Sequence, residues 1–433
     1  MRAAARVNSW LARWRPGLRL EPWFSPFALV NGAGVGLSPI LLPATAARYG
    51  VGHVGLVMGA FNLGALAAPL AGSLADRFRA YRMLAVAAAA VTALALVLFP
   101  WAGPAVQVLL GLAEGGGFAA ALTVANLLIV ERRPEAEWNS RLGWLETTLS
   151  VGQAGALFLA AWLSGLSIRS ALLAGAIVPA AAIPLALALI PRVRTAAPRP
   201  ARGGHQLASN GQVGEWGPAS PSRVHHLHQR RRPLAAVRAL LGSGFGWMLA
   251  AWIPSYAGAA VVFSLYPVLF RHAFGVATTT SALAFAVIVL VSLPLYVMAG
   301  RVSQRHGPAR VIAAALALRV VLLGALAAFA AASHIVAFLP LAAFAGIMFA
   351  WSFLSVASPG LTALLKPGAE GDAQGILNAS TGLAGLLGSA GGGLIAGSWG
   401  YPSALAAGAA AVALGLVILA ATMLRRGAKT ATP

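Results

Sequence analysis

The sequence contains no cysteine and very little acid. None of its 433 residues is Cys, and Asp and Glu together number only 10. The lack of cysteine excludes a disulfide framework, a zinc site with Cys ligands and a thiol nucleophile. Charged residues make up 9% of the chain, whereas a soluble domain carries about 25%. A chain of this length with so few charges could not cover a soluble surface.

Apolar residues dominate the sequence instead. They make up 59% of it, and the mean hydropathy is +0.79. They form blocks of about 20 residues, long enough as helices to cross a hydrocarbon core of about 30 Å. Strands of a membrane barrel would alternate apolar and polar residues, and these blocks do not. We therefore predict an all-α membrane protein with twelve spans, at 26–47, 53–75, 82–101, 104–130, 142–164, 169–191, 243–270, 277–300, 309–332, 335–358, 373–397 and 401–424.

The net charge of +21 follows this topology. With both termini in the cytoplasm, 27 of the 31 Lys and Arg residues fall in cytoplasmic segments. The predicted outside loops hold only Arg48, Arg169 and Arg271, and Arg319 lies within a span. This asymmetry is typical of a multi-pass protein of the inner cell membrane. Because the arginines lie between apolar blocks and form no separate basic domain, we expect no nucleic-acid partner.

The spans form two halves, at residues 26–191 and 243–424, joined by a basic linker at 192–242. The linker is rich in Arg, Pro, Gly and Ser, which predicts a flexible cytoplasmic segment. Its histidine cluster at 225–228 has no acidic or Cys residue nearby, so we expect no metal site and no cofactor. The run Arg230–Arg232 is suited to anionic lipid headgroups.

Two cytoplasmic ends flank the halves. The tail covers residues 425–433, and the N-terminal segment covers residues 1–25. Within the latter, four apolar residues follow helical spacing, at Val7, Trp10, Leu11 and Trp14. This spacing indicates an interfacial helix, and a disordered basic tail is the alternative.

One short pattern occurs in both halves. The loop after the second span reads GSLADRFRAYR at 72–82, and the loop after the eighth reads GRVSQRHGPAR at 300–310. The pairs that match at one offset are Gly72 with Gly300, Arg77 with Arg305, and Arg82 with Arg310. Two six-helix halves with the same loop predict a parallel repeat with pseudo-two-fold symmetry.

These loops resemble motif A of the major facilitator superfamily, a G-x-L-A-D-R-x-G-R-R pattern between the second and third helices. The first copy departs from it by placing Arg79 where the family has Gly. The second copy has Gly307 there, with Gln304 in place of the acid. Residues 371–375, which open the eleventh helix, also resemble the family. Two signatures of its drug–proton antiporters are missing: Gly111 stands where they carry Arg, and the fifth helix lacks their Gly-Pro pair.

The resemblance implies a cytoplasmic latch that closes in the outward-facing state. In such a latch Gly72 lets one helix approach another closely, and Asp76 meets the positive N-terminus of a neighbouring helix. The arginines bind carboxylates or helix-end carbonyls. The alternative is that these charges only set the topology.

Only two acids lie inside predicted spans, and they are candidates for proton coupling. Glu114 is near the midplane of the fourth span, and Glu146 is closer to the cytoplasmic face of the fifth, where it could pair with Arg141 or the motif loop. A charge in the membrane costs about 2.5–3.5 kcal/mol on insertion scales, so each such residue is a functional candidate. A protonated Glu114 that only bonds a neighbouring helix is the alternative. Arg319 is also near the midplane, where a structural role is expected and a substrate role is the alternative.

Uncharged polar and aromatic residues complete the candidate substrate cavity. They are Asn31, Asn62, Gln153, Trp252, Tyr256 and Asn378. For the amides, hydrogen bonds between helices are the alternative role. Trp252 and Tyr256 continue a stripe from Met248, which either lines an aromatic cavity or packs in the core.

These features predict a secondary transporter that moves a small solute by alternating access, as a proton-coupled exporter. An uncoupled facilitator, a sugar or metabolite importer, and a non-transporting receptor are the alternatives. The sequence lacks H-E-x-x-H, G-x-S-x-G and P-loop patterns, so we expect neither an enzyme nor ATP hydrolysis. The expected partners are a small-molecule substrate, protons and anionic lipids, with a monomeric chain.

Overall fold

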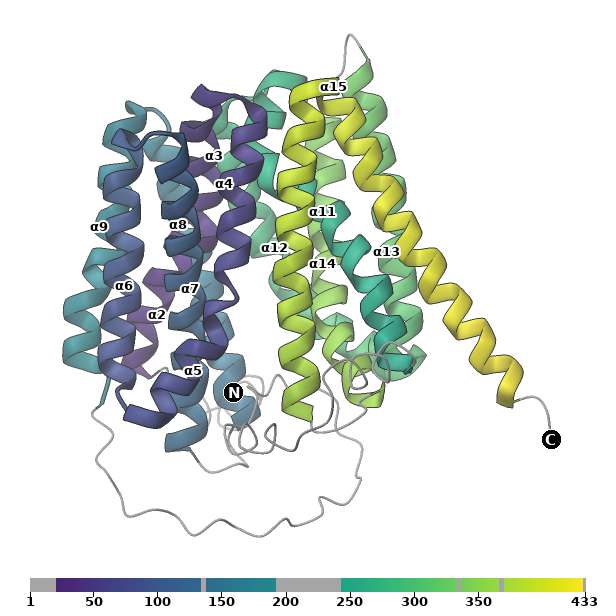
Figure 1. The fold of residues 1–433 in the computed structure, drawn as a ribbon, viewed down its shortest axis with the longest axis horizontal. Helices are drawn as coiled ribbons and strands as arrows, with labels where there is room; N and C mark the ends of the chain where they lie inside the picture. Colours follow the sequence, from purple (N-terminus) through teal and green to yellow (C-terminus); the bar gives the residue numbers. More distant parts are fainter. Residues whose placement is uncertain (1–20, 134–137, 192–242, 333–335, 366–369, 431–433) are drawn as a thin grey trace, which may run out of the picture.

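The computed structural model describes residues 21–133, 138–191, 243–332, 336–365 and 370–430, and all regular secondary structure in these ranges is helical. The helices run side by side in two groups that follow the chain order (Figure 1). The predictions for residues 1–20, the linker with its histidines, and residues 431–433 lie outside the described part of the chain.

The first membrane crossing of the first half is built from several short helical segments in succession. Its pieces are η1 (Pro22–Phe24), α2 (Ser25–Gly32), the π-helical turn η2 (Ala33–Leu37), α3 (Ser38–Ala46) and η3 (Ala47–Tyr49). The remaining elements are α4 (Val51–Gly64), α5 (Ala67–Phe78), α6 (Tyr81–Leu98), η4 (Phe99–Trp101), α7 (Pro104–Arg132), α8 (Trp138–Leu163) and α9 (Ile168–Leu189). Pro104 begins α7, where a missing backbone N–H costs nothing.

The second half has five continuous helices. They are α11 (Gly244–Phe274), α12 (Thr278–His306), α13 (Pro308–Ala331), α14 (Phe338–Leu365) and α15 (Glu370–Thr430). The last one turns back on itself at Gly400, whose φ of 83° is left-handed and suits glycine. Its two arms therefore count as two crossings, and both lie in the second half (Figure 1).

The predicted architecture of twelve crossings in two six-helix halves is confirmed. By apolar length and composition alone, nine of the described helical segments qualify as spans, and the two arms of α15 count once among them. Two further crossings are not among these nine segments: the fifth, α8, and the second, which is broken into α4 and α5. Hydrogen bonds of the 3₁₀ type, from Ala65 N to Asn62 O (3.1 Å) and from Leu66 N to Leu63 O (3.0 Å), bridge this break. The break was not predicted from the sequence.

The two halves contact each other over only part of their length. We call the end of the bundle with the two repeat loops the loop end, and the opposite end, with Gly50 and Gly400, the far end. Close packing of α4 on α15 runs along the far half of both helices: a Cβ on Gly393 would lie 2.6 Å from Gly55 Cα. Near the far end, Ser164 and Thr279 also share a hydrogen bond of 2.6 Å across the halves.

The loop end is different. There α5 packs chiefly on α7 of its own half and diverges from α15 (Figure 1). Three large apolar residues of α5 are exposed as a result, Leu70 at 67%, Leu74 at 44% and Phe78 at 63%. The halves are therefore joined at the far end and separated at the loop end.

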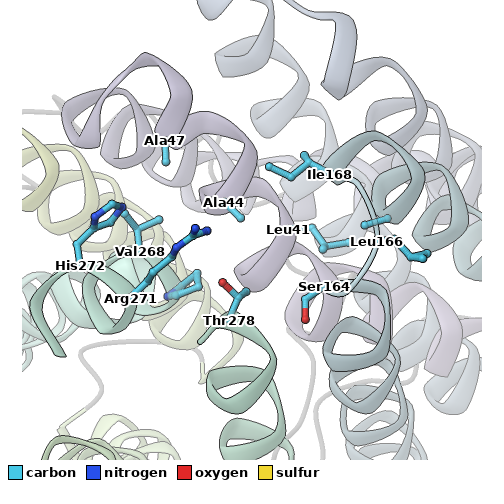
Figure 2. Close-up of a pocket in the computed structure, with 12 residues that line it drawn as sticks. Leu41, Ala44, Ala47, Ser164, Leu166, Ile168, Val268, Arg271, His272 and Thr278 are labelled. Carbon is cyan, nitrogen blue, oxygen red and sulfur yellow. The ribbon is translucent and has the colours of Figure 1, made fainter. Parts of the chain in front are cut away.

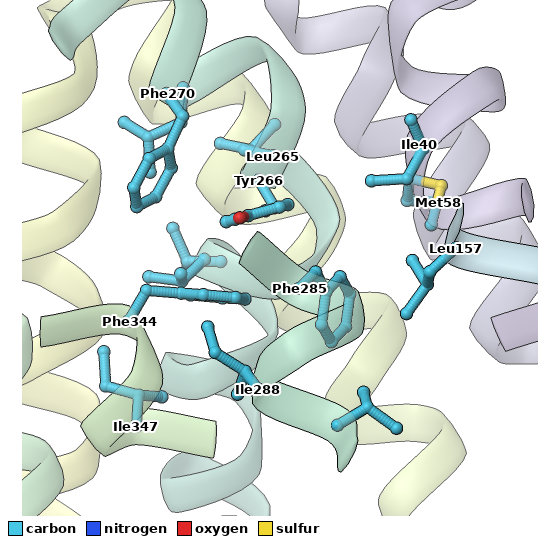
Figure 3. Close-up of a cluster of buried hydrophobic side chains, with 14 of the residues drawn as sticks. Ile40, Met58, Leu157, Leu265, Tyr266, Phe270, Phe285, Ile288, Phe344 and Ile347 are labelled. Carbon is cyan, nitrogen blue, oxygen red and sulfur yellow. The ribbon is translucent and has the colours of Figure 1, made fainter. Parts of the chain in front are cut away.

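An aromatic core stabilises the second half. Tyr266 of α11 stacks on Phe344 of α14 with 4.0 Å between ring centroids, and its hydroxyl donates to Ser281 O at 2.8 Å. Phe270 and Phe285 contact the same rings edge-on or tilted (Figure 3). The buried apolar cluster continues from these rings into the first half through Ile40 and Leu157. This continuity matches the contact of the halves at the far end.

Candidate functional site

Glu114 lies on α7 with no exposed surface. The hydroxyl of Ser38, the first residue of α3, contacts its Oε1, while Oε2 is buried without a hydrogen-bond partner. The Ser38 hydroxyl also lies 2.9 Å from the carbonyl oxygen of Ala33. A hydroxyl has one proton to donate. If Ser38 donates to Ala33, Glu114 must itself donate to Ser38, which requires a protonated carboxyl.

The π-helical turn η2 creates this contact. It widens the first crossing between Ala33 and Leu37, and Ser38 follows directly. Insertions of this kind are rare in helices and occur frequently at functional sites. Gly34, within the turn, packs against the ring of Phe118 on α7, where a Cβ would lie 2.6 Å from Cδ2. The turn and the helix with the carboxyl are thus packed together without space between them.

Glycines on α7 hold it close to α4. A Cβ on Gly111 would lie 2.8 Å from Val57 O, and a Cβ on Gly115 would overlap the carbonyl of Phe61. The two helices therefore touch backbone to backbone on both sides of Glu114 in the sequence.

Glu146 occupies a different environment. It is exposed on α8, closer to the loop end of that helix than to its far end. Its expected partner Arg141 instead pairs with Glu21 at 3.2 Å, and Arg133 pairs with the same carboxylate at 2.8 Å. Trp23 Nε1 also donates to Glu21. Glu21 therefore ties the start of the first crossing to the end of α7 and the start of α8, a role that sequence reasoning missed.

The first motif loop has a left-handed residue where the family motif has glycine. Arg79 ends α5 with φ of 48°, the one positive φ among the described residues other than glycine. Arg77 lies over the ring of Phe78, 5.3 Å from its centroid, and Arg82 has a buried Nε without a partner. The side chain of Asp76 lies outside the described residues. A Cβ on Gly72 would lie 3.6 Å from Thr123, an ordinary distance, so the close approach predicted there is not found.

The second motif loop also has a positive φ at the corresponding position, but its backbone differs, with ψ of 143° at Gly307 against 29° at Arg79. Gly307 has φ of 83° at the position that corresponds to Arg79. Arg305 and Arg310 are exposed, and a Cβ on Gly300 would meet nothing within 4 Å. Both loops thus present their arginines at the separated end of the halves.

The intramembrane amides bond between helices. Asn31 Nδ2 donates to Leu149 O at 2.9 Å and Gln153 Nε2 to Val35 O at 3.2 Å, which joins the first crossing to α8. Asn62 Nδ2 donates to Met58 O at 2.8 Å and to Ser389 Oγ on α15 at 3.1 Å, across the two halves. The alternative role given to these residues is the one observed. Asn378 is exposed near the start of α15.

The aromatic stripe of α11 packs partly in the core. Met248 is 4% and Trp252 6% exposed, and Trp252 Nε1 donates to Thr381 Oγ1 at 2.8 Å. Tyr256 is half-buried and stacks on Trp252 at 6.2 Å. Trp351 of α14, which was not selected from the sequence, completes the group at 5.6 Å from Tyr256.

Two of the cavities among the described residues bear on the site. The larger, about 100 Å³, is at the far end between the halves (Figure 2). Arg271 and His272 of α11 face Ala44 and Ala47 of the first half there. The smaller, about 10 Å³, lies beside Met248 and Trp252. Neither cavity includes Glu114, and none of the predicted cavity residues lines the larger one.

Comparison with known proteins defines the class. Nucleoside transporter NupG matches with a TM-score of 0.67 and 13% identity, over 93% of this chain and 98% of that one. A D-xylose-proton symporter matches at 0.67 and 16%, over 94% and 97%. A bacterial homolog of the human lysosomal transporter Spinster, inward-facing and occupied, matches at 0.65 and 15%, over 93% and 95%. These similarities concern the fold, which is that of a membrane transporter.

Sequence comparison identifies the family. A family model of the Major Facilitator Superfamily matches residues 24–260 and 253–433. None of the curated protein sequences matches the chain. The chain belongs to the major facilitator superfamily, and it is a transporter rather than an enzyme.

Proposed function

We propose that this chain is a proton-coupled exporter of a small solute, with Glu114 as the coupling carboxyl. The observation that carries the proposal is the burial of Glu114 against Ser38 with Oε2 left without a partner. An ionised carboxylate in that place would be expensive, because a buried charge requires a partner or several hydrogen bonds. Glu114 therefore holds its proton in this conformation.

The loop end faces the cytoplasm in this proposal. Both repeat loops and most of the described Lys and Arg residues are at that end, as the positive-inside rule requires. The separated loop end and the joined far end then correspond to an inward-facing state of an inner-membrane protein. Reporter fusions to residue 1, to the linker 192–242 and to residue 433 should all report the cytoplasm. A linker signal from the other side would overturn the two-half topology.

Proton release requires a change in packing. Deprotonation would reverse the Ser38 hydrogen bond toward Glu114 and leave Oε2 unsolvated, so the carboxylate needs access to water. The tight contacts at Gly34 and Gly115 exclude water in the present state. Movement of α4 or α3 relative to α7 would admit water, and such movement accompanies the exchange of inward and outward states. Protonation and conformation are coupled in this way.

Export follows if the substrate binds only while Glu114 is ionised, so that substrate binding and protonation of Glu114 exclude each other. A substrate that binds when Glu114 is ionised is released when the carboxyl is protonated again, which exchanges protons for solute. The two motif loops act as the latch that closes the loop end. Proton-coupled import and uncoupled facilitated transport are the competing functions. The direction of solute transport relative to an imposed pH gradient distinguishes them from export.

The test uses purified full-length protein in vesicles. A thermal-shift panel of drugs, sugars and metabolites first selects a solute that binds, because a ligand of the folded state raises its stability. Uptake of that solute is then driven by an imposed pH gradient. Glu114→Gln keeps the size and hydrogen bonding of the side chain but cannot titrate, so it should abolish uphill transport and retain counterflow.

Glu146→Gln is the matched control and should keep uphill transport. If the Glu114→Gln protein still concentrates the solute with unchanged pH dependence, Glu114 is not the coupling group. If uptake proceeds only when the gradient favours symport, the chain is an importer.

A further inference from the structure

Among the described residues of the second half, Arg319 is the one buried cation, and no acid lies beside it. Arg319, the twelfth residue of α13, is 1% exposed. The half from residue 243 to 424 has only two acids, Glu370 and Asp372, both at the loop end of α15. Within the described residues Arg319 forms no ion pair and no hydrogen bond. A guanidinium does not lose its proton in a protein, so this charge remains uncompensated.

The unpartnered atoms of Arg319 are its Nε and Nη2. These two nitrogens present their N–H bonds on one edge of the guanidinium, which is the edge that receives a carboxylate through two parallel hydrogen bonds. The guanidinium carbon lies over two rings, 5.6 Å from the Trp351 ring centroid and 5.8 Å from that of Phe263. These cation–π contacts stabilise the cation without using its N–H donors.

Aromatic surface adjoins this edge. Trp351 lies 6.5 Å from Trp252 and 5.6 Å from Tyr256, centroid to centroid. Trp351 and Tyr256 are half-buried, whereas Arg319 is fully buried. Exposed surface of Trp351 and Tyr256 therefore adjoins a buried cation. A ligand with a planar apolar body fills the space between the rings while its charged end pairs with the guanidinium.

We propose that this Arg319 site binds an aromatic carboxylate, with the carboxylate on Nε and Nη2 and the ring against Trp351 and Tyr256. The proposal gives the substrate class for the transport function proposed above, and it rests on that function only for the step of transport. Binding itself requires neither a proton gradient nor Glu114.

The test compares four probes on purified full-length protein in detergent: benzoate, acetate, benzyl alcohol and benzylamine. Benzoate should raise the melting temperature and change tryptophan fluorescence. Acetate lacks the apolar body, benzyl alcohol lacks the charge, and benzylamine has the opposite charge, so each should bind at least about tenfold more weakly. If none of the four probes binds, or if benzyl alcohol binds as well as benzoate, the proposal is wrong.

Variants locate the site. Arg319→Lys keeps a buried cation but cannot donate two parallel hydrogen bonds from one edge. Benzoate should therefore bind at least about tenfold more weakly. Trp351→Phe keeps a ring and should remove the fluorescence change while binding persists. Arg271→Gln, at the exposed arginine of the far-end cavity, is the control and should bind normally. Unchanged benzoate affinity in Arg319→Lys would overturn the proposal.

A separate variant distinguishes this proposal from the function above. Glu114→Gln should bind benzoate like the wild type. Loss of gradient-driven transport in Glu114→Gln with benzoate binding intact supports both proposals. Benzoate binding that depends on Glu114 instead of Arg319 would place the anion in the first half and overturn this one.

Discussion

The two halves share a plan of six crossings but differ in the ionisable group that each buries in the membrane, an acid in the first and a base in the second. Glu114 is buried in the first half on α7, and Arg319 is buried in the second on α13. The offset that relates Arg82 to Arg310 relates Arg319 to Val91, which is 40% exposed on α6. The repeated sequence pattern is therefore present in the loops but absent at the membrane midplane. This difference indicates that the two loops have the same role, whereas the buried residues of each half have different roles.

Both halves contain glycines at close helix contacts. Substitution of these glycines has the largest expected effect on stability. Gly115 of α7 contacts the Phe61 carbonyl, and Gly388 of α15 contacts the Ala257 carbonyl, with no room for a Cβ at either place. Gly115→Ala and Gly388→Ala should each cost about 3 kcal/mol of stability, because the helices must separate.

Open glycines supply the controls for these two variants. A Cβ on Gly155 in the first half, or on Gly391 in the second, would meet nothing within 4 Å, so Ala should be harmless at both positions. Thermal unfolding in detergent measures all four variants. Equal melting temperatures for Gly115→Ala and Gly155→Ala would contradict the packing account.

The two motif loops differ in one charge. Asp76 of the first copy corresponds to Gln304 of the second, so only the first copy can place an anion near a helix N-terminus. Asp76→Asn makes the copies alike and should remove up to about 2 kcal/mol from the state with the loop end closed. Transport should fall while solute binding changes little, because the variant shifts the balance of open states.

Gln304→Asn is the matched control and should transport normally. Cysteine labelling is well suited to this question, since the chain has no Cys of its own. A single Cys at the exposed Leu74 should be labelled more readily in the Asp76→Asn background. Unchanged labelling and transport would show that the loop charges only set the topology.

Backbone strain also differs between the loops. Arg79 adopts a left-handed φ of 48°, whereas its counterpart Gly307 adopts 83° without a side chain. Arg79→Gly should therefore stabilise the protein, and Gly307→Ala should destabilise it, each by about 1 kcal/mol. Melting temperatures should move in opposite directions. Movement in the same direction would mean that side-chain contacts outweigh backbone strain.

The smallest expected effect concerns the contact between the halves. Asn62 donates to Ser389 across them, and Ser389 also bonds Ser264. A hydrogen bond of this kind in a membrane is worth about 0.6 kcal/mol, so Asn62→Ala should open the far end slightly. Labelling of a single Cys at Thr279 would detect the change, with Asn31→Ala, which affects one half only, as control. Equal labelling in both variants would show that Asn62 does not join the halves.

Much of the fold followed from the sequence because lipid imposes simple requirements. Apolar blocks and the arrangement of arginines predicted twelve crossings, and scarcity of acid selected Glu114, which the structure places in a buried contact with Ser38. The π-helical turn that brings Ser38 there has no signal in hydropathy. The same is true of the break between α4 and α5, which depends on contacts of Gly64 with α7.

Side-chain partners were harder to predict than helices. The pairing of Glu21 with Arg133 and Arg141 joins residues far apart in the chain, and nothing in their spacing indicates it. Gly72 was expected to allow close packing, yet ordinary space surrounds it. Motif resemblance identifies positions that matter in a family, whereas the contacts at each position depend on the neighbouring helices and the conformational state.

The protonation of Glu114 is the property whose measurement tests the proposed coupling most directly. Infrared difference spectroscopy detects the carbonyl stretch of a protonated carboxyl in the membrane. We expect such a band at neutral pH in the wild type, its loss in Glu114→Gln, and a shift in Ser38→Ala, because the Ser38 hydroxyl bonds the acid. Glu146→Gln should leave the band unchanged. A wild-type spectrum without the band, or a band that persists in Glu114→Gln, would contradict the claim that Glu114 carries the coupled proton.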